Sequence, residues 1–271
     1  MARQRYWPAG ALDAIAPYGE RKSVVVGIDG SRASLNAARW AVAEAIQRDA
    51  VLRLVHAVPA SEFSPGPPDR HVCNADAALL DARDEVKDVG NSVCLELTRK
   101  VGDPDKVLIA ESCSADLICI GEPAPRIPTG KLFGSTAAAL LERAHCPVAI
   151  MRTGADGALR DGGVVSVVLD DQPDNDAVVH LAMQEGRLRN ATVRQIDRRL
   201  KSWIRRYPDV HVEISAAGTG RQYRSAGNDN GRVQLAVVSD SDADDMATLG
   251  MPNCHPIVGY PDSSVLMYRK R

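Results

Sequence analysis

The chain has 271 residues, of which 45% are hydrophobic and only 4% aromatic, so its cores must be built from Val, Ile, Leu and Ala. Lysine and arginine number 33 against 35 aspartate and glutamate, and neither half is basic, which argues against nucleic-acid binding by charge. No apolar run reaches membrane-spanning length, and residues 1–21 lack the apolar core of a signal sequence. We therefore expect a cytoplasmic protein with no nucleic-acid or membrane partner.

Predicted strands and helices alternate along the first half. After a flexible N-terminal arm at 1–20, the continuous β-branched run Val24–Ile28 is typical of a strand buried on both faces, as in parallel sheets. Further strands are predicted at 51–58, 93–100, 117–120 and 147–151, with helices at 35–47, 75–89, 104–113 and 134–143. Strands that alternate with helices predict βαβ units and a parallel sheet.

The second half repeats the first. Four matching positions lie at a constant offset of 141, namely Asp29 with Asp170, Glu44 with Glu185, Arg48 with Arg189 and Ala50 with Ala191. The last strand, Ser264–Arg269, repeats Pro147–Arg152 at an offset of 117, so the second copy is shorter by about 24 residues, the difference between the two offsets. We predict two tandem domains, at 21–153 and 164–271, joined by a glycine-rich linker at 154–163.

The most informative segment follows the fourth predicted strand, which we expect to end at Gly121. A proline-bearing loop comes next, and the chain enters a helix through Gly134, Ser135 and Thr136. A glycine lets a ligand approach the backbone closely, and the first N–H groups of a helix attract an anion. The segment therefore predicts binding of nucleotide phosphates. A turn at Gly121 and a plain helix start at Gly134 remain the alternative.

Asp29 is the second candidate site residue, because it follows the first strand at its carboxyl end, where open α/β sheets bind ligands. Its carboxylate could accept hydrogen bonds from a ribose or an adenine amino group, or it could simply cap the first helix. Ser135 could donate to a phosphate or reach Mg²⁺, and Arg126 or Lys131 could neutralise phosphate charge. No metal-ligand cluster and no general base are evident, so any ATP hydrolysis is expected to be slow.

These residues resemble the bacterial universal stress proteins of the tandem, two-domain kind, most closely the mycobacterial and other actinobacterial members. The family's nucleotide signature is Gly, two residues, Gly, nine residues, then Gly and Ser or Thr, and Gly121, Ala124 and Gly134-Ser135 keep that spacing. The resemblance implies an α/β fold of two tandem open parallel-sheet domains, Rossmann-like and related to the adenine nucleotide alpha hydrolases. It also implies a stress-response switch or sensor that binds ATP in its first domain.

The resemblance further implies site residues and partners. Asp29 would lie near the adenosine, Ala57 would offer backbone contacts to adenine, and Gly102 would approach the nucleotide. The remaining positions would surround the phosphates, namely Gly121, Ala124, Gly134, Ser135 and Thr136. We expect a homodimer or an intramolecular pair of domains, since the strand at 147–151 could pair with either, and an unknown regulatory protein as partner.

Departures from the family pattern weaken this expectation. Ala124 replaces the second glycine, Glu122 puts a negative charge where a phosphate would approach, and the prolines of the loop lack N–H donors. We therefore predict weakened ATP binding or a preference for a less charged nucleotide. In the second copy an acidic stretch at 239–245 replaces the glycine loop, so we expect no ATP there. A scaffold that binds no nucleotide and acts through protein contacts is the alternative function.

Overall fold

The computed structural model of the chain describes residues 22–59, 70–89, 92–124, 132–159, 161–167, 175–195, 207–214, 233–240 and 263–270. The first half contains β1 (Ser23–Gly27), α1 (Arg32–Arg48), β2 (Val51–Val58), α2 (Arg70–Val89), β3 (Leu95–Val101), α3 (Pro104–Ser112), β4 (Leu117–Pro123), α4 (Ser135–Arg143) and β5 (Val148–Thr153). The second half contains β6 (Val164–Val167), α5 (Asn175–Leu188), β7 (Val193–Gln195), β8 (Val212–Ile214), β9 (Val233–Val238) and β10 (Ser264–Met267).

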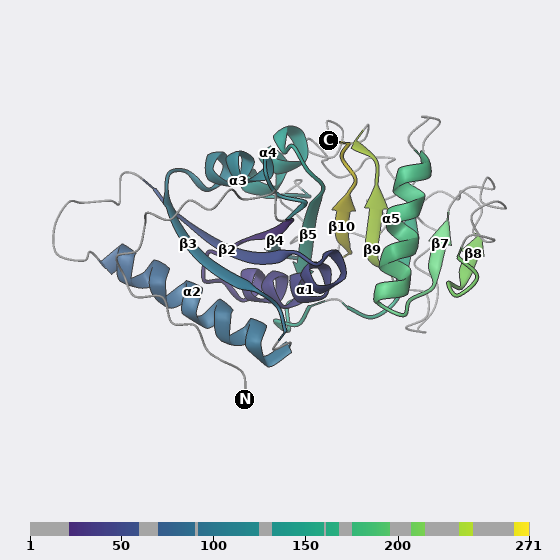
Figure 1. Cartoon of the computed structure of the whole chain (residues 1–271), viewed down its shortest axis with the longest axis horizontal. Helices are drawn as coiled ribbons and strands as arrows, with labels where there is room; N and C mark the ends of the chain where they lie inside the picture. Colours follow the sequence, from purple (N-terminus) through teal and green to yellow (C-terminus); the bar gives the residue numbers. More distant parts are fainter. Residues whose placement is uncertain are drawn as a thin grey trace.

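All ten of these strands join one sheet, in the order β3-β2-β1-β4-β5-β10-β9-β6-β7-β8 (Figure 1). Neighbouring strands are parallel except β5 and β10, which are antiparallel. The order on one side of this junction is the mirror of the order on the other, so each half is an open parallel sheet of the same topology. This symmetry matches the internal repeat of the sequence and confirms the predicted α/β fold class.

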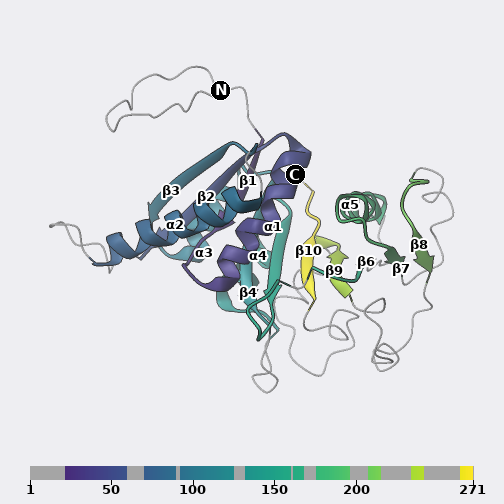
Figure 2. The same ribbon diagram turned by 90° about the horizontal axis from the view of Figure 1, so that it is seen from below.

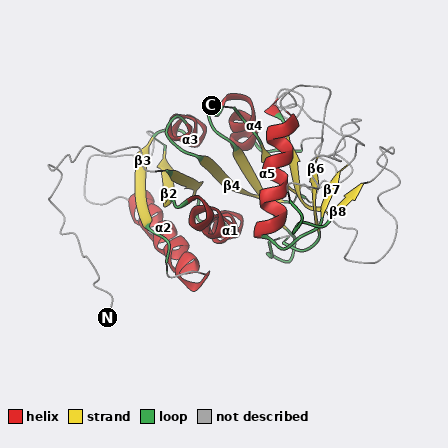
Figure 3. Ribbon diagram, turned by 45° about the vertical axis from the view of Figure 1, so that its right-hand side comes forward, coloured by secondary structure: helices red, strands yellow, loops and turns green. Residues whose placement is uncertain are grey.

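Helices cover both faces of the first half of the sheet, as its buried β-branched strands require. Helices α1 and α2 lie on one face of the first half, and α3 and α4 lie on the other (Figure 3). Helix α5 covers the second half on the α1 side, where residues of both helices share one apolar cluster (Figure 2). The strands β1, β4 and β5 are therefore covered by helices on both faces, and because they are parallel their carboxyl ends lie at one edge of the sheet.

The junction between the halves is a strand pair within one chain. Val265 of β10 lies opposite Ile150 of β5, and Leu266 lies opposite Ala149. The edge of β5 that we expected to pair with another copy or with the second domain is thus covered by β10. The intramolecular pair is the arrangement in the structure, and a homodimer would need another surface. The division into domains at 153 and 164 stays a prediction, because the two halves share one sheet.

Two repeated residue pairs meet beside this junction. Glu44 on α1 forms an ion pair with Arg48 of the same helix, and Glu185 on α5 pairs with Arg189 at 2.9 Å. Arg189 also forms an ion pair with Glu44, and its guanidinium lies 4.2 Å from the ring centre of Trp40. The two glutamates are fully buried. The sequence repeat at these positions therefore marks an ionic contact between the halves.

Several predicted boundaries differ from those of the structure, and two of these differences stand out. Strand β4 does not end at Gly121 but continues to Pro123, because its last residues pair with Met151–Thr153 of β5. Helix α2 begins at Arg70, five residues before the predicted start at Ala75. Within the described ranges, no helix is both long and apolar enough to cross a membrane.

Candidate functional site

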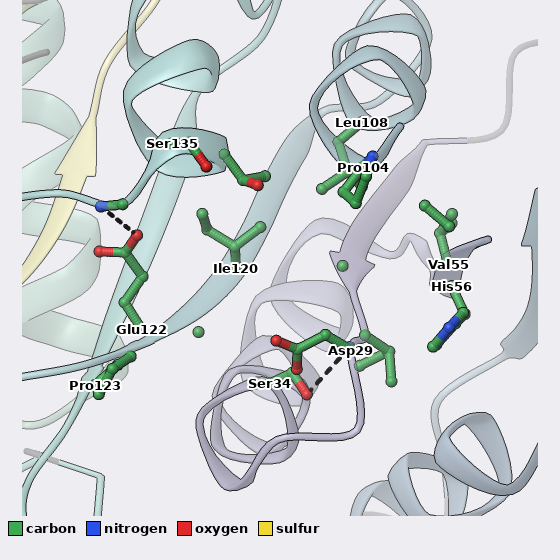
Figure 4. Close-up of a pocket in the computed structure, with 16 residues that line it drawn as sticks. Asp29, Ser34, Val55, His56, Pro104, Leu108, Ile120, Glu122, Pro123 and Ser135 are labelled. Atoms are coloured by element: carbon green, nitrogen blue, oxygen red, sulfur yellow. Dashed lines mark hydrogen bonds between the residues drawn. The ribbon is translucent and has the colours of Figure 1, made fainter. Parts of the chain in front are cut away.

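A cavity of about 410 Å³ lies at the carboxyl ends of β1, β2 and β4 (Figure 4). The crossover from β1 leads to β2 on one side, while β4 flanks β1 on the other, so this is the topological switch point where open α/β sheets bind ligands. The starts of α3 and α4 complete the wall. The described lining residues are Gly27, Ile28, Asp29, Ser34, Val55, His56, Ala57, Pro104, Leu108, Ile120, Gly121, Glu122, Pro123, Gly134, Ser135 and Thr136.

Asp29 lines the cavity and stabilises the turn that leads into α1, while the N-cap of that helix is Ser31. Its Oδ1 accepts the N–H of Ser31 at 2.9 Å, and Ser31 in turn caps α1 by accepting the N–H of Ser34. Partial burial raises the pKa of Asp29, but hydrogen bonds from Ser31, Ser34 and the backbone outweigh it and hold the pKa below its ordinary value. The carboxylate is therefore ionised at neutral pH while it lines the cavity.

The end of β2 contributes His56 and Ala57 to the wall. The Nδ1 atom of His56 is buried and has no hydrogen-bond partner among the described residues. Burial lowers the pKa of the imidazole, and the charges of Asp29 and Asp76 oppose that effect only in part. A neutral imidazole carries one donor and one acceptor nitrogen, so His56 can bind a polar ligand group of either kind.

Glu122 lies at the opposite end of the cavity and contacts the start of α4. Its Oε1 accepts the backbone N–H of Gly134 at 2.9 Å (Figure 4). Its Oε2 accepts from Arg152 Nη1 at 2.7 Å. Gly134 is the N-cap of α4 and has no side chain to cap the helix, and the Glu122 carboxylate accepts the N–H of this N-cap residue, as the glutamate of a capping box does. The side chain of Glu122 is 13% exposed and that of Arg152 only 2%. Burial raises the pKa of Glu122, and the Arg152 charge and the Gly134 N–H oppose that rise.

Gly121 allows β4 and α1 to pack at backbone distance. A Cβ built on Gly121 would lie 1.9 Å from the carbonyl oxygen of Ala33 and 2.6 Å from the nitrogen of Ser34. No other residue fits such an approach, whether or not a ligand is bound. Its position in the signature therefore has a packing reason that the sequence pattern alone did not reveal.

The structure brings six of the eight predicted site residues to the cavity wall, namely Asp29, Ala57, Gly121, Gly134, Ser135 and Thr136. Gly102 and Ala124 are not among the lining residues. Gly102 adopts a φ of 145°, which favours glycine, at the turn into α3. The N–H of Ala124 donates to the carbonyl of Thr153 at 2.7 Å, which holds this residue beside β5. The positions of both residues therefore have structural reasons that do not involve a ligand.

The candidate phosphate-neutralising residues Arg126 and Lys131 lie outside the described residues, as does most of the acidic stretch 239–245. The sequence reasoning missed His56 and Ser34 as lining residues. It interpreted Glu122 only as an obstacle, although the register of β4 with β5, which sets Glu122 opposite Arg152, shows that the carboxylate has a cationic partner. Among the described residues, no three His, Cys, Asp or Glu side chains are grouped so that they could hold a metal ion.

Comparison with known proteins places the chain in a family. The model of the universal stress protein family matches residues 20–152. Two universal stress proteins of Mycobacterium tuberculosis strain H37Rv align with almost the whole chain. One is 37% identical and covers 92% of this chain and 97% of the relative. The other is 34% identical and covers 86% and 94%.

A solved structure shows the same fold. The crystal structure of a universal stress protein from Archaeoglobus fulgidus superposes with a TM-score of 0.62 and 13% identity, over 92% of this chain and 96% of that one. The family model stops at the end of the first half, whereas the mycobacterial relatives extend through the second. Since the match to these relatives spans both halves at more than 30% identity, the chain belongs to the universal stress protein family.

Proposed function

We propose that the first half of this universal stress protein binds an adenine nucleotide in the cavity between β1, β2 and β4 and acts as a stress-response switch or sensor. The supporting observation is that six residues of the family's nucleotide pattern, from four separate elements of the chain, line one cavity at the switch point of the sheet. The cavity volume of about 410 Å³ lies within the range of small-molecule sites, roughly 300–1,000 Å³. ATP, with or without Mg²⁺, is the ligand implied by the family resemblance.

The two ends of the cavity suit the two parts of such a ligand. At the β1 and β2 end, the ionised Asp29 and the neutral His56 offer hydrogen bonds for ribose hydroxyls or a base, and Val55 and Leu108 offer apolar walls. At the other end, helix α4 begins at Ser135, and the first-turn N–H groups of a helix have no acceptors within it. An adenine nucleotide would place its nucleoside at the first end and its phosphates at the second.

Thermal unfolding with and without ligand tests the proposal. A saturating adenine ligand at 100 times its Kd should stabilise the protein by about 2.7 kcal/mol. Asp29→Ala should lose most of this gain, because it removes a polar group from the nucleoside end. Asp156→Ala is the matched control, since Asp156 makes the same kind of turn by accepting the N–H of Ala158 at 3.1 Å and does not line the cavity.

The alternative is a scaffold that binds no nucleotide, and the observation that favours it is the Glu122 carboxylate on the Gly134 N–H. If adenosine, AMP and ATP all leave the unfolding temperature of the wild-type protein unchanged, the nucleotide proposal is wrong and the scaffold remains. Measurement of ATP hydrolysis with and without Mg²⁺ would decide whether bound ATP turns over.

A further inference from the structure

Within the proposed adenine site, one of the backbone N–H groups at the start of α4 that could hold an anion, that of Gly134, is already bonded to a carboxylate of the protein itself. The first N–H of an uncapped helix start is where a phosphate oxygen would be held, by hydrogen bonding and by the helix dipole. Here the Gly134 N–H donates to the carboxylate of Glu122 at 2.9 Å. A carboxylate is an anion of the same sign as phosphate, so the protein supplies an internal substitute for it.

The Glu122 carboxylate cannot easily move away from Gly134, because its second oxygen accepts a hydrogen bond from Arg152. Arg152 donates to Glu122 at 2.7 Å, to the carbonyl of Leu132 at 2.5 Å and to that of Pro123 at 3.3 Å. Its backbone N–H donates to the Ser264 side chain of β10 at 3.0 Å, and its guanidinium stacks on Phe133 at 4.9 Å. A buried arginine with this many contacts has little freedom, so Glu122 stays at Gly134 as long as the ion pair is intact.

The opposite end of the cavity has no such obstacle. His56 Nδ1 is a buried nitrogen without a partner among the described residues, and Asp29 and Ala57 face the same space. This end can satisfy the hydrogen-bonding groups of a nucleoside without bringing two anions together. The two ends of the cavity thus differ in the ligand groups that they can bind: one suits a neutral nucleoside, and the other disfavours an anion.

We propose that this pocket ranks adenine ligands by charge, and that Glu122 makes adenosine bind more tightly than AMP and AMP more tightly than ATP. The inference rests on the proposed function, since it assumes that adenine compounds bind in this cavity. The Glu122 charge is largely compensated by Arg152, so the penalty is smaller than that between two isolated charges. We expect about a tenfold loss of affinity for each step along the series.

Isothermal titration calorimetry with adenosine, AMP and ATP, in Mg²⁺-free buffer at one salt concentration, tests the ranking on the full chain. Glu122→Gln should reverse it, because it removes the negative charge of the carboxylate and leaves the positive charge of Arg152 uncompensated near the phosphate end of the cavity. AMP should gain at least about tenfold over adenosine in this variant. Glu142→Gln is the matched control, since it removes one negative charge from the exposed far end of α4 and should leave the wild-type order intact.

The outcomes are distinct. If wild-type protein binds ATP as tightly as adenosine or more tightly, the ranking is refuted while the nucleotide site stands. If none of the three compounds binds, the proposed function fails and the ranking fails with it. If Glu122→Gln does not fold, Glu122→Asp retains a carboxylate for Arg152 but is one methylene too short to reach Gly134, and AMP should then gain on adenosine. An unchanged AMP-to-adenosine ratio in a folded Glu122 variant would also refute the role of this residue.

Discussion

A single added methyl group at Gly121 should damage the fold more than one at the other glycines that the structure describes. In Gly121→Ala, the new Cβ would lie 1.9 Å from the Ala33 carbonyl oxygen and 2.1 Å from its carbon. Ordinary contacts of a Cβ begin near 3.4 Å. Both obstructing atoms belong to the backbone of α1, so no side-chain rotation can relieve the overlap. Strand β4 would have to move away from α1 by roughly an ångström or more.

The expected loss of unfolding free energy follows from the separation of β4 from α1. Overpacking of a core usually costs about 1–3 kcal/mol, and more where backbone must shift. Val26, Cys119 and Ala37 belong to the apolar cluster on the α1 side of the sheet and are all 0% exposed, so little slack exists between β4 and α1. We expect Gly121→Ala to lower the free energy of unfolding by at least about 3 kcal/mol, which corresponds to a drop in Tm of roughly 6–12 °C for a chain of this size.

Two other glycines calibrate the experiment. A Cβ at Gly27 would meet the Leu108 methyl at 2.9 Å, a flexible side chain that can yield, so Gly27→Ala should cost about 1 kcal/mol or less. A Cβ at Gly162 would meet nothing within 4 Å, and Gly162→Ala should change stability by no more than about 0.5 kcal/mol.

Urea unfolding followed by circular dichroism would measure all three variants against the wild type. The expected order of stability is Gly162→Ala, then Gly27→Ala, then Gly121→Ala. Should Gly121→Ala unfold at the same urea concentration as Gly162→Ala, β4 cannot approach α1 as closely as described, and the packing reason given for this glycine is wrong.

Three further changes test the ion pairs and the junction between the halves. Burial, together with the nearby charge of Glu44, raises the pKa of Glu185 to about 8, so between pH 5 and 8 the folded state holds a proton that the unfolded chain has released. The free energy of unfolding should therefore fall as the pH rises from about 5 to 8. In thermal unfolding, Glu185→Gln should flatten this dependence on pH. In urea unfolding, Arg152→Met should destabilise the protein by about 3–5 kcal/mol, because it leaves the buried carboxylate of Glu122 without a cation. Arg143→Met, which removes an exposed ion pair, should cost less than about 1 kcal/mol. Equal losses in the two variants would contradict the burial of the Glu122–Arg152 pair. Leu266→Asp puts a charge at a fully buried position of β10 and should separate β10 from the edge of β5. The exposed edge of β5 should then cause concentration-dependent association in sedimentation. A variant that stays monomeric and stable would argue against the β5–β10 pair.

The sequence predicted the fold and most of the cavity wall because both depend on local patterns. Continuous β-branched runs specify buried strands, and the alternation with helices specifies a parallel sheet, in which strand carboxyl ends meet at one edge. Asp29 follows one strand, Ala57 lies in the last residues of the next, and Gly134 precedes a helix, so the pattern and the family resemblance together predicted that they converge. The offset of 141 predicted the second copy, whose strands have the same order.

Other features required the tertiary structure. Gly102 and Ala124 were expected at the site from the family resemblance but do not line the cavity, because the turn before α3 and the end of β4 direct them elsewhere. The antiparallel pairing of β5 with β10 could not be predicted from the sequence, since the open edge of β5 could equally well pair with another copy of the chain. His56 carries no local mark that separates a packed histidine from one that lines a pocket.

The sequence by itself determined that this protein is a tandem α/β chain with a nucleotide-type loop after its fourth strand. Only the tertiary structure decided that the Glu122 carboxylate holds the Gly134 N–H, that Arg152 fixes it there, and that Ser264 of the second half contacts that arginine. The physical reason is distance along the chain. Secondary structure follows from patterns that repeat within a few residues, whereas these contacts join residues 12, 30 and 112 positions apart and depend on how the strands pack.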